Sequence, residues 1–262
     1  MELDVGRKNV LMLSPGFPYP VRSGGQARVY NLIKEVSKHH DVTFLSFVVE
    51  NDMPFIKHME QFCKSVETVR VDVYDDRLRR YAAAFGPRHI YRTASRLGQW
   101  TRGMPFQMCR FHDPRMCRKL RRLVSGGSFD VVHSTYAQLG PYLSMAKRTD
   151  PTVATVLTDI DLVFVTMERE ESTRKGPAKL LFASDRKRVS SYVAREWTSF
   201  SKIIAMSDVD RQKLLAVQPD LDVAVVPNGV DTAYFAPVGE RRADSVKLMF
   251  LGGSQHSPNV DA

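Results

Sequence analysis

The hydrophobic and polar positions of this chain follow two patterns. Short, wholly apolar runs indicate buried strands, and stretches with an apolar residue at every third or fourth position indicate helices with one buried face. Near the start, residues 9–13 read as a buried strand, residues 26–38 as an amphipathic helix and residues 41–48 as a second strand. This order predicts a β-α-β unit at the beginning of the fold.

The same alternation continues along most of the chain. Further strands are predicted at residues 66–73, 129–133, 152–157, 202–206 and 223–226. Helices are predicted at residues 53–63, 75–100 with an interruption, 114–125, 138–147, 180–197 and 207–217, and a polar, mobile loop at residues 169–179. Asp113 can cap the helix at residues 114–125, and Pro114 suits its first turn. Apolar strands that alternate with helices predict an α/β fold with a doubly wound, mostly parallel sheet. Sheets of this kind bind ligands beyond the carboxyl ends of their strands.

The last part of the sequence repeats the start of such a unit. Residues 237–245 have the polar composition of a linker, and residues 248–251 form an apolar run that leads into two glycines. A Ser-Pro-Asn helix-start signal follows at residues 257–259, close to the end of the sequence. We therefore expect a first domain at residues 1–240 and, at residues 241–262, a linker with the first strand of a second domain.

Composition places the chain among ordinary globular proteins. Hydrophobic residues make up 43% and charged residues 26% of the sequence. The longest apolar stretch is far shorter than the roughly 18 residues of a membrane-spanning helix, and the acidic start "MELD" does not resemble a secretory signal, so we expect a cytoplasmic protein. Three cysteines without a C-x-x-C pair predict reduced packing residues, neither disulfides nor zinc ligands.

The net charge of +9 is concentrated in one segment. Residues 70–122 contain 14 Lys and Arg against 4 Asp, so the remaining residues carry a net charge of −1. Aromatic and leucine side chains are interleaved with these arginines, which is the pattern of a helix that lies on an anionic membrane surface. The alternatives are an anionic acceptor, solvated arginines whose stems cover apolar surface, and nucleic acid, for which no binding motif is present.

The clearest candidate for ligand binding is the Ser-Gly-Gly at residues 23–25, just ahead of the first predicted helix. Gly24 and Gly25 allow the backbone to approach a ligand, and the start of a helix favours an anionic oxygen such as that of a diphosphate. Arg28, one turn later, adds charge if it faces the ligand. The alternative is a simple glycine turn with Arg28 on a solvated face. The first turn lacks G-x-G-x-x-G, which disfavours a nicotinamide enzyme.

Other candidate residues follow predicted strands. Asp159 and Asp161, in "LTDID", can hydrogen-bond a hydroxyl or stabilise positive charge, or can cap the next helix. His133 ends the strand in "FDVVH" and is either a ligand contact or a structural histidine. Ser207 reads as a helix cap that borders the same edge, and Asn228 as part of an Asn-Gly turn. No His, Cys and carboxylate spacing indicates a metal site.

Five stretches, in order, resemble one family. They are "SPGFPYPVRSGGQARVYNLI", "FDVVHSTYA", "KIIAMSDVDRQKLL", "VAVVPNGVD" with "YFAP", and "LMFLGGSQHSPNVDA". Together they are similar to retaining, two-lobed glycosyltransferases of the GT-B type, family 4, including the sugar transferases of exopolysaccharide synthesis. The resemblance implies that this chain is the N-terminal, acceptor-side lobe, Rossmann-like in fold, with only the first strand of the nucleotide-sugar-binding lobe.

The resemblance also implies a function and roles for the candidate residues. It implies transfer of a hexose from a nucleotide-diphosphate sugar to a saccharide or lipid-linked acceptor, with retention of configuration and without a metal cofactor. Gly24 and Gly25 would face the donor phosphates, with Arg28, His133, Ser207 and Asn228 around the cleft and Asp159 and Asp161 near the transferred sugar. Thr158 stands where the family often has a histidine, which separates this chain from the usual pattern.

Two further hypotheses belong to other functional classes. One is a non-catalytic module that binds an acceptor or a membrane surface, because a chain without a donor pocket would be inactive alone. The other is a sugar-nucleotide epimerase on the same two-lobed scaffold, which the motifs fit less well. A lipid-linked acceptor would explain peripheral attachment to the inner face of the cytoplasmic membrane through residues 70–122.

Overall fold

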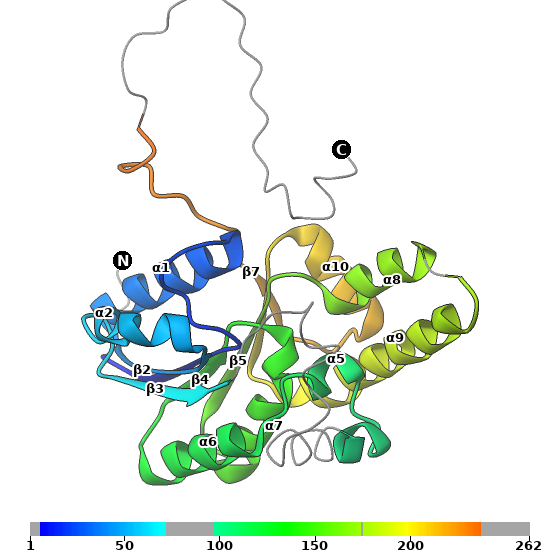
Figure 1. The fold of residues 1–262 in the computed structure, drawn as a ribbon, viewed down its shortest axis with the longest axis horizontal. Helices are drawn as coiled ribbons and strands as arrows, with labels where there is room; N and C mark the ends of the chain where they lie inside the picture. The colour runs from blue at the N-terminus through cyan, green and yellow to red at the C-terminus, as the bar shows by residue number, and fades with distance from the viewer. Residues whose placement is uncertain (1–5, 72–96, 174, 237–262) are drawn as a thin grey trace, which may run out of the picture. The chain divides into compact units, whose positions relative to one another are not determined.

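The fold is built on a seven-stranded sheet (Figure 1). The computed structural model describes residues 6–71, 97–173 and 175–236. The strand order is β3-β2-β1-β4-β5-β6-β7, and every neighbouring pair is parallel. The strands are β1 Asn9–Ser14, β2 Asp41–Val48, β3 Ser65–Arg70, β4 Val131–Ser134, β5 Ala154–Asp159, β6 Lys202–Ala205 and β7 Val223–Val225. The predicted doubly wound, parallel α/β fold is confirmed.

Helices connect the strands and cover both faces of the sheet. The α-helices are α1 Gly24–His39, α2 Ile56–Met59, α5 Phe106–Cys109, α6 Pro114–Gly126, α7 Gly140–Thr149, α8 Val163–Thr173, α9 Pro177–Glu196 and α10 Asp208–Val217. Short 3-10 helices are η1 Glu50–Phe55, η2 Ala137–Leu139 and η3 Trp197–Ser199. Figure 1 shows α1 and α2 on one side of the sheet and α6 and α7 on the other.

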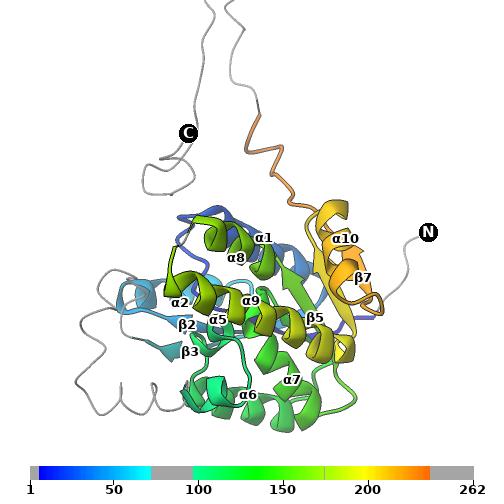
Figure 2. The ribbon, with the colours of Figure 1, turned by 90° about the vertical axis from the view of Figure 1, so that its right-hand side faces the viewer.

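Two hydrophobic clusters hold these layers together. Alternate residues of β1 point to opposite faces, so that Val10 and Met12 pack with α1 and α2, whereas Leu11 and Leu13 pack with α6, α7, α8 and α9. On the second face, α9 lies beside α7 (Figure 2), and side-chain atoms of Tyr192 and Trp197 lie 3.5 Å from the position of a β-carbon on Gly140. A β-carbon at Gly140 would therefore be in ordinary van der Waals contact with both side chains.

The order of the strands reverses between β1 and β4. The chain runs from β1 to β2 and β3 in one direction, then returns to pair β4 with the other side of β1. The loop after β1 and the loop after β4 therefore diverge toward opposite faces of the sheet. This is the topological switch point at which open α/β sheets form a ligand crevice.

Helix starts follow the capping signals in the sequence. Asp113 caps α6 by accepting a hydrogen bond from the Arg115 N–H, with Pro114 in the first turn, as predicted. Ser23 caps α1 through the Gln26 N–H, so Gly24 and Gly25 are the first two residues of the helix. The prediction that they precede the helix is wrong, because the cap at Ser23 starts the helix two residues earlier than predicted.

Other predicted boundaries also need correction. Residues 169–179 are not one loop, because α8 continues to Thr173 and α9 begins at Pro177; Gly176 lies between them with a φ of 63°. The helix predicted at residues 53–63 is instead the end of η1, which contains Pro54, followed by the single turn of α2, which ends at Met59. The predicted helix at residues 75–100 lies outside the described residues except for 97–100, which are helical. The linker and strand predicted at residues 237–262 also lie outside them.

By packing, the chain divides into two units, Met1–Asn228 and Gly229–Ala262. In the described part of the second unit, the Asp231 carboxylate accepts hydrogen bonds from the N–H groups of Ala233 and Tyr234. These bonds form a local turn. The domain boundary predicted at residue 240 stays a prediction.

The three cysteines are buried. Burial raises the pKa of the Cys63 thiol to about 12 and, as the main cause, that of Cys117 to about 11, and the Cys109 thiol donates to the Met104 carbonyl oxygen at 3.6 Å. They therefore serve as packing residues. Within the described ranges, no helix is long and apolar enough to cross a lipid bilayer.

Candidate functional site

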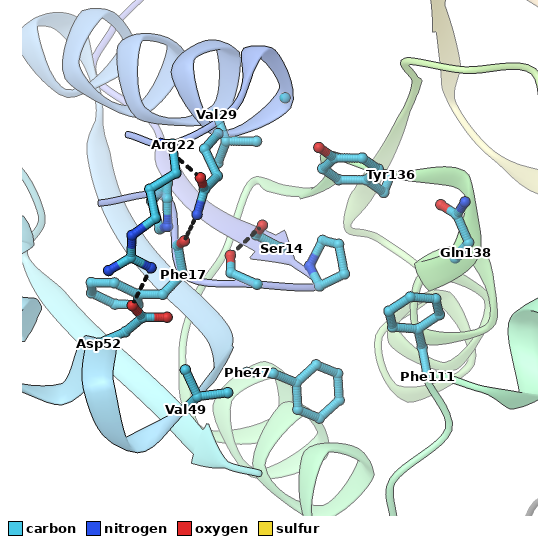
Figure 3. Close-up of a pocket in the computed structure, with 15 residues that line it drawn as sticks. Ser14, Phe17, Arg22, Val29, Phe47, Val49, Asp52, Phe111, Tyr136 and Gln138 are labelled. Carbon is cyan, nitrogen blue, oxygen red and sulfur yellow. Dashed lines mark hydrogen bonds and ion pairs between the residues drawn. The ribbon is translucent and has the colours of Figure 1, made fainter. Parts of the chain in front are cut away.

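A pocket of about 430 Å³ opens at the switch point (Figure 3). It lies where β1, β2 and β4 end and α1 begins, and one wall comes from the loop between α5 and α6. Seven of its fifteen lining residues are Pro, Phe or Val. The lining residues are Ser14, Pro15, Gly16, Phe17, Pro18, Arg22, Gly25, Gln26, Val29, Phe47, Val49, Asp52, Phe111, Tyr136 and Gln138.

Hydrogen bonds within the pocket fix the loop that follows β1. The Ser14 hydroxyl donates to the Gly16 carbonyl oxygen at 2.8 Å. The Gln26 side chain donates to the Phe17 carbonyl oxygen at 3.0 Å and accepts from the Arg22 N–H at 2.9 Å. One glutamine of α1 thus holds both halves of the loop, which gives the pocket a fixed wall.

An ion pair closes one end of the pocket. The Arg22 Nη1 lies 2.9 Å from the Asp52 Oδ1, with the aspartate buried and the arginine side chain 53% exposed (Figure 3). Asp52 belongs to η1, which follows β2. The pair therefore joins the loop after β1 to the turn after β2 while leaving part of the guanidinium open to solvent.

Gly25 and Tyr136 meet at the other end of the pocket. A β-carbon on Gly25 would lie 2.1 Å from the Tyr136 hydroxyl oxygen, whereas one on Gly24 would have nothing within 4 Å. Burial, and then the charge of Asp161, raises the pKa of Tyr136. The structure thus brings Gly25, Tyr136 and Asp161 into one neighbourhood, and Gly24 lies just outside it.

Arg28 does not lie on a solvated face. Its Nη1 donates to the Pro227 carbonyl oxygen at 3.2 Å and to the Asn228 Oδ1 at 2.8 Å, and its Nη2 donates to the Val226 carbonyl oxygen at 3.0 Å. Burial lowers the pKa of Arg28, and within the described residues its buried Nε has no hydrogen-bond partner. Both terminal nitrogens are therefore engaged by the segment after β7, which fixes that segment to α1.

Asn228 acts in this contact as an acceptor. We predicted that Asn228 and Gly229 tolerate positive φ in a turn, but Gly229 has no positive φ. The local turn lies further on, at residues 232–235. The tertiary contact with Arg28, which no local pattern shows, gives Asn228 its role.

His133 is a buried residue of β4 that contacts β5. Its Nε2 lies 2.8 Å from the Thr158 hydroxyl oxygen. Burial, and then the charge of Arg28, lowers the pKa of His133 to about 4, so the imidazole is neutral at physiological pH. In this chain, the histidine of β4 and the threonine of β5 therefore form one hydrogen-bonded pair under α1.

The two aspartates after β5 have different surroundings. The predicted strand ended at residue 157, but β5 extends to Asp159, which is buried, while Asp161 is exposed. Burial, followed by the charges of Asp161 and Asp210, raises the pKa of Asp159 well above its usual range. Within the described residues, its Oδ2 has no hydrogen-bond partner. Asp159 is thus a buried acid with a raised pKa, and Asp161 is the carboxyl group that reaches solvent.

Ser207 is occupied by helix capping. Its hydroxyl accepts from the Asp210 N–H at 3.1 Å and donates to the Asp210 Oδ2 at 2.7 Å. Of the sequence candidates, the structure groups Gly25 with Asp161, and Arg28 with Asn228 and His133. It leaves Gly24 and Ser207 at the margins.

Sequence reasoning missed the residues that form the pocket walls. Tyr136 stands three residues after His133, and its importance depends on a contact with Gly25 that is 111 positions away in the sequence. Phe47 belongs to β2, Phe111 to the loop between α5 and α6, and Gln138 to η2. No periodic pattern marks them, although an aromatic residue after a strand end is a weak signal.

The described residues, 6–71, 97–173 and 175–236, contain no group of three or more His, Cys, Asp or Glu side chains that could hold a metal ion. The expectation of a reaction without a metal cofactor stays a prediction.

The parallel sheet, its flanking helices and the pocket at its switch point define an α/β protein with a Rossmann-like fold. The chain belongs to glycosyltransferase family 4, because the model of that family matches residues 22–234. The chain thus contains a domain of a glycosyltransferase family. A search of curated proteins gives no match.

Several solved structures resemble this chain at low sequence identity. The N-terminal domain of trehalose-6-phosphate phosphatase from Candida albicans has a TM-score of 0.50 at 11% identity, over 87% of this chain and 50% of that chain. Anabaena HepE in complex with UDP and glucose has 0.48 at 13%, over 87% and 46%. Arabidopsis thaliana UGT89C1 complexed with UDP has 0.45 at 10%, over 86% and 50%. The chain thus spans about half the length of these structures.

The contact between Gly25 and Tyr136 yields a double-variant prediction. Gly25→Ala will destabilise the fold by about 1–3 kcal/mol because its β-carbon overlaps the tyrosine hydroxyl. Gly24→Ala, with open space around it, will change stability by less than about 0.5 kcal/mol. Combining Gly25→Ala with Tyr136→Phe will recover most of the loss, since the remaining Cζ lies 3.4 Å away. Urea unfolding measures all four proteins; equal effects of the two alanines would contradict the prediction.

The buried histidine yields a pH prediction. His133 is neutral in the folded protein down to about pH 4 but is protonated below about pH 6.5 when unfolded. Its contribution to stability is therefore complete above pH 6.5 and is lost as the pH falls to 4, by about 3 kcal/mol. Asp159, with its raised pKa, favours the folded state as the pH falls. The wild type and the His133 variant described next both contain Asp159, so its effect is the same in both.

The free energy of unfolding is measured against pH for the wild type and for His133→Gln, a variant that keeps a polar atom near Thr158. The wild type will lose stability relative to the variant between pH 6.5 and 4, and the two curves will run parallel above pH 7. A constant difference across the whole range would show that His133 titrates normally.

Proposed function

We propose that this chain is the acceptor-side lobe of a retaining hexosyltransferase, which moves a sugar from a nucleotide-diphosphate donor to a saccharide or lipid-linked acceptor. The family match over residues 22–234 carries the proposal. The pocket at the switch point supports it, because this lobe then has a ligand site of its own. The length, about half that of the similar structures, supports a second lobe that binds the nucleotide.

The start of α1 is proposed to face the donor diphosphate. The first backbone N–H groups of a helix have no acceptor within the helix, and the helix dipole favours an anion there. Ser23 accepts from Gln26, which leaves the N–H groups of Gly24 and Gly25 at the end of the helix. The absent side chain at Gly25 allows Tyr136 to lie against the same helical turn. Arg28 stands one turn deeper and holds residues 226–228.

Asp161 is proposed to act on the acceptor or on the transferred sugar. It is exposed at the carboxyl edge of the sheet, and its charge acts on the Tyr136 hydroxyl. In the reaction, the bond from the anomeric carbon to the diphosphate breaks with its electron pair going to the phosphate. The acceptor hydroxyl forms the new bond on the same face and passes its proton to the departing phosphate oxygen. Asp159, which is buried and has a raised pKa, supports the geometry of this edge.

The biological setting is proposed to be surface polysaccharide or glycolipid assembly in the cytoplasm. We propose no metal cofactor, with Lys and Arg of the second lobe neutralising the diphosphate. The chain alone is then expected to be inactive, since it lacks these groups.

Transfer and binding assays test the proposal. UDP and GDP will bind weakly or not at all to this 262-residue chain in calorimetry, and one of them will bind a form extended by a second lobe. In the extended form, Asp161→Asn will lower the rate of nucleotide release from its sugar donor by about 10- to 100-fold. Asp220→Asn, an exposed aspartate after α10, is the control and will leave the rate unchanged. Tight nucleotide binding by the short chain would overturn the division into two lobes.

A membrane-binding role is the second candidate, and exposed apolar side chains support it. Leu97 and Phe106 are 58% and 56% exposed, and Trp100 is 38% exposed. They lie in the basic stretch 70–122. The Arg188 guanidinium stacks 4.6 Å from the Trp100 ring centre, which places positive charge beside an exposed aromatic side chain. This combination fits the interface of an anionic bilayer, here proposed to be the inner face of the cytoplasmic membrane.

Vesicle sedimentation tests this second candidate. The chain will bind vesicles that contain phosphatidylglycerol more strongly than neutral phosphatidylcholine vesicles, and added salt will weaken the binding. The double variant Trp100→Ser and Phe106→Ser will lose most of the binding, whereas Val209→Ser, a similarly exposed residue of α10, will not. Equal binding to both vesicle types would exclude the proposal.

A further inference from the structure

The pocket at the switch point is apolar on its inner walls. The side chains of Phe47 and Phe111 lie on the same side of the cavity, with Val49 beside Phe47 (Figure 3). Phe17 and Phe47 are each only 2% exposed, so these walls belong to the hydrophobic core and keep their positions. A ligand that enters this space leaves water and meets mainly carbon atoms.

The polar groups of the pocket are mostly engaged by the protein itself. The Ser14 hydroxyl and the Gln26 amide bind backbone groups of the loop after β1, and Asp52 binds Arg22. A buried sugar ring needs a partner for each hydroxyl that loses water. These bonds use part of the capacity of the three side chains, so few groups remain for the several hydroxyls of a saccharide deep in the pocket.

Two polar side chains remain on one side of the opening. Within the part of the chain that the structure describes, neither the Tyr136 hydroxyl nor the Gln138 amide makes a side-chain hydrogen bond, and both lie together in Figure 3. Tyr136 also borders Gly25 and the charge of Asp161. The pocket thus has an apolar interior and a polar edge directed toward the proposed site of transfer.

We propose that this pocket binds the apolar part of an amphipathic acceptor, an alkyl or aryl glycoside whose hydroxyls face Tyr136 and Gln138. Calling this ligand an acceptor rests on the proposed function, whereas the predicted binding of a glycoside in the pocket does not. A volume of about 430 Å³ falls in the usual range for small-molecule sites and accommodates a chain of several carbons or one aromatic ring. The acceptor class is thereby narrowed from saccharides in general to glycosides with an apolar group.

A homologous series of ligands tests the proposal without any transfer reaction. Methyl, butyl, hexyl and octyl β-D-glucosides, each below its micelle concentration, are titrated into the chain by calorimetry. Affinity will rise by up to about fourfold for each added methylene until the pocket is filled. Glucose and maltose will show no measurable binding. Saccharides that bind as tightly as octyl glucoside, or no binding by any member, would overturn the inference.

Two variants locate the binding. Phe111→Ala removes a half-buried wall, and Val49→Phe fills the cavity without deleting any core atoms; each will weaken octyl glucoside binding at least tenfold. Phe62→Ala removes a half-buried ring that contacts Tyr30 and does not line the pocket, and it will leave binding unchanged. Equal binding by all four proteins would show adsorption of a surfactant and overturn the inference.

The result also separates this inference from the proposed function. Glycoside binding that depends on Phe111 and Val49 would stand even if the extended protein transferred no sugar from any donor. Transfer to free saccharides with no glycoside binding here would support the function and reject the acceptor class.

Discussion

The parallel pairing of β1 with β2 on one side and β4 on the other is the constraint on which the rest depends. Since α1 must cross one face to reach β2, and α6 and α7 occupy the other face, the loops after β1 and β4 separate. The pocket lies between them. Its walls are continuous with the two hydrophobic clusters, so its shape is set by the same packing that stabilises the sheet.

Helix α1 connects this pocket to two other features. Its first turn supplies Gly25 and Gln26 to the pocket, and one turn later Arg28 binds residues 226–228, where the first unit ends. Beneath the helix, His133 and Thr158 form a buried pair whose neutral imidazole avoids a second positive charge near Arg28. A shift of α1 would therefore change both the pocket and the position of residues 226–228.

The sequence predicted the fold more fully than the site. The bounds of β2 agree with the predicted residues 41–48, and the caps at Asp113 and Ser207 were also predicted, because these features depend on local periodicity and on side chains that bond their own neighbours. The polar stretch at residues 169–179 misled the prediction. Its helices are held by packing, through Met167 of α8 and Val189 of α9, and by the pair of Arg186 with Glu171, which lie 15 positions apart.

The alternation of apolar runs and amphipathic stretches by itself determined a doubly wound α/β protein, and five ordered motifs placed it near one enzyme family. Only the tertiary structure decided that Arg28 binds residues 226–228. It also decided that Asp159 is buried while Asp161 reaches solvent, and that Tyr136 lies against Gly25. Hydrophobic periodicity records which residues leave water, and that is a local property. The partner of a polar or aromatic group is chosen by the packing of distant segments, which no local pattern contains.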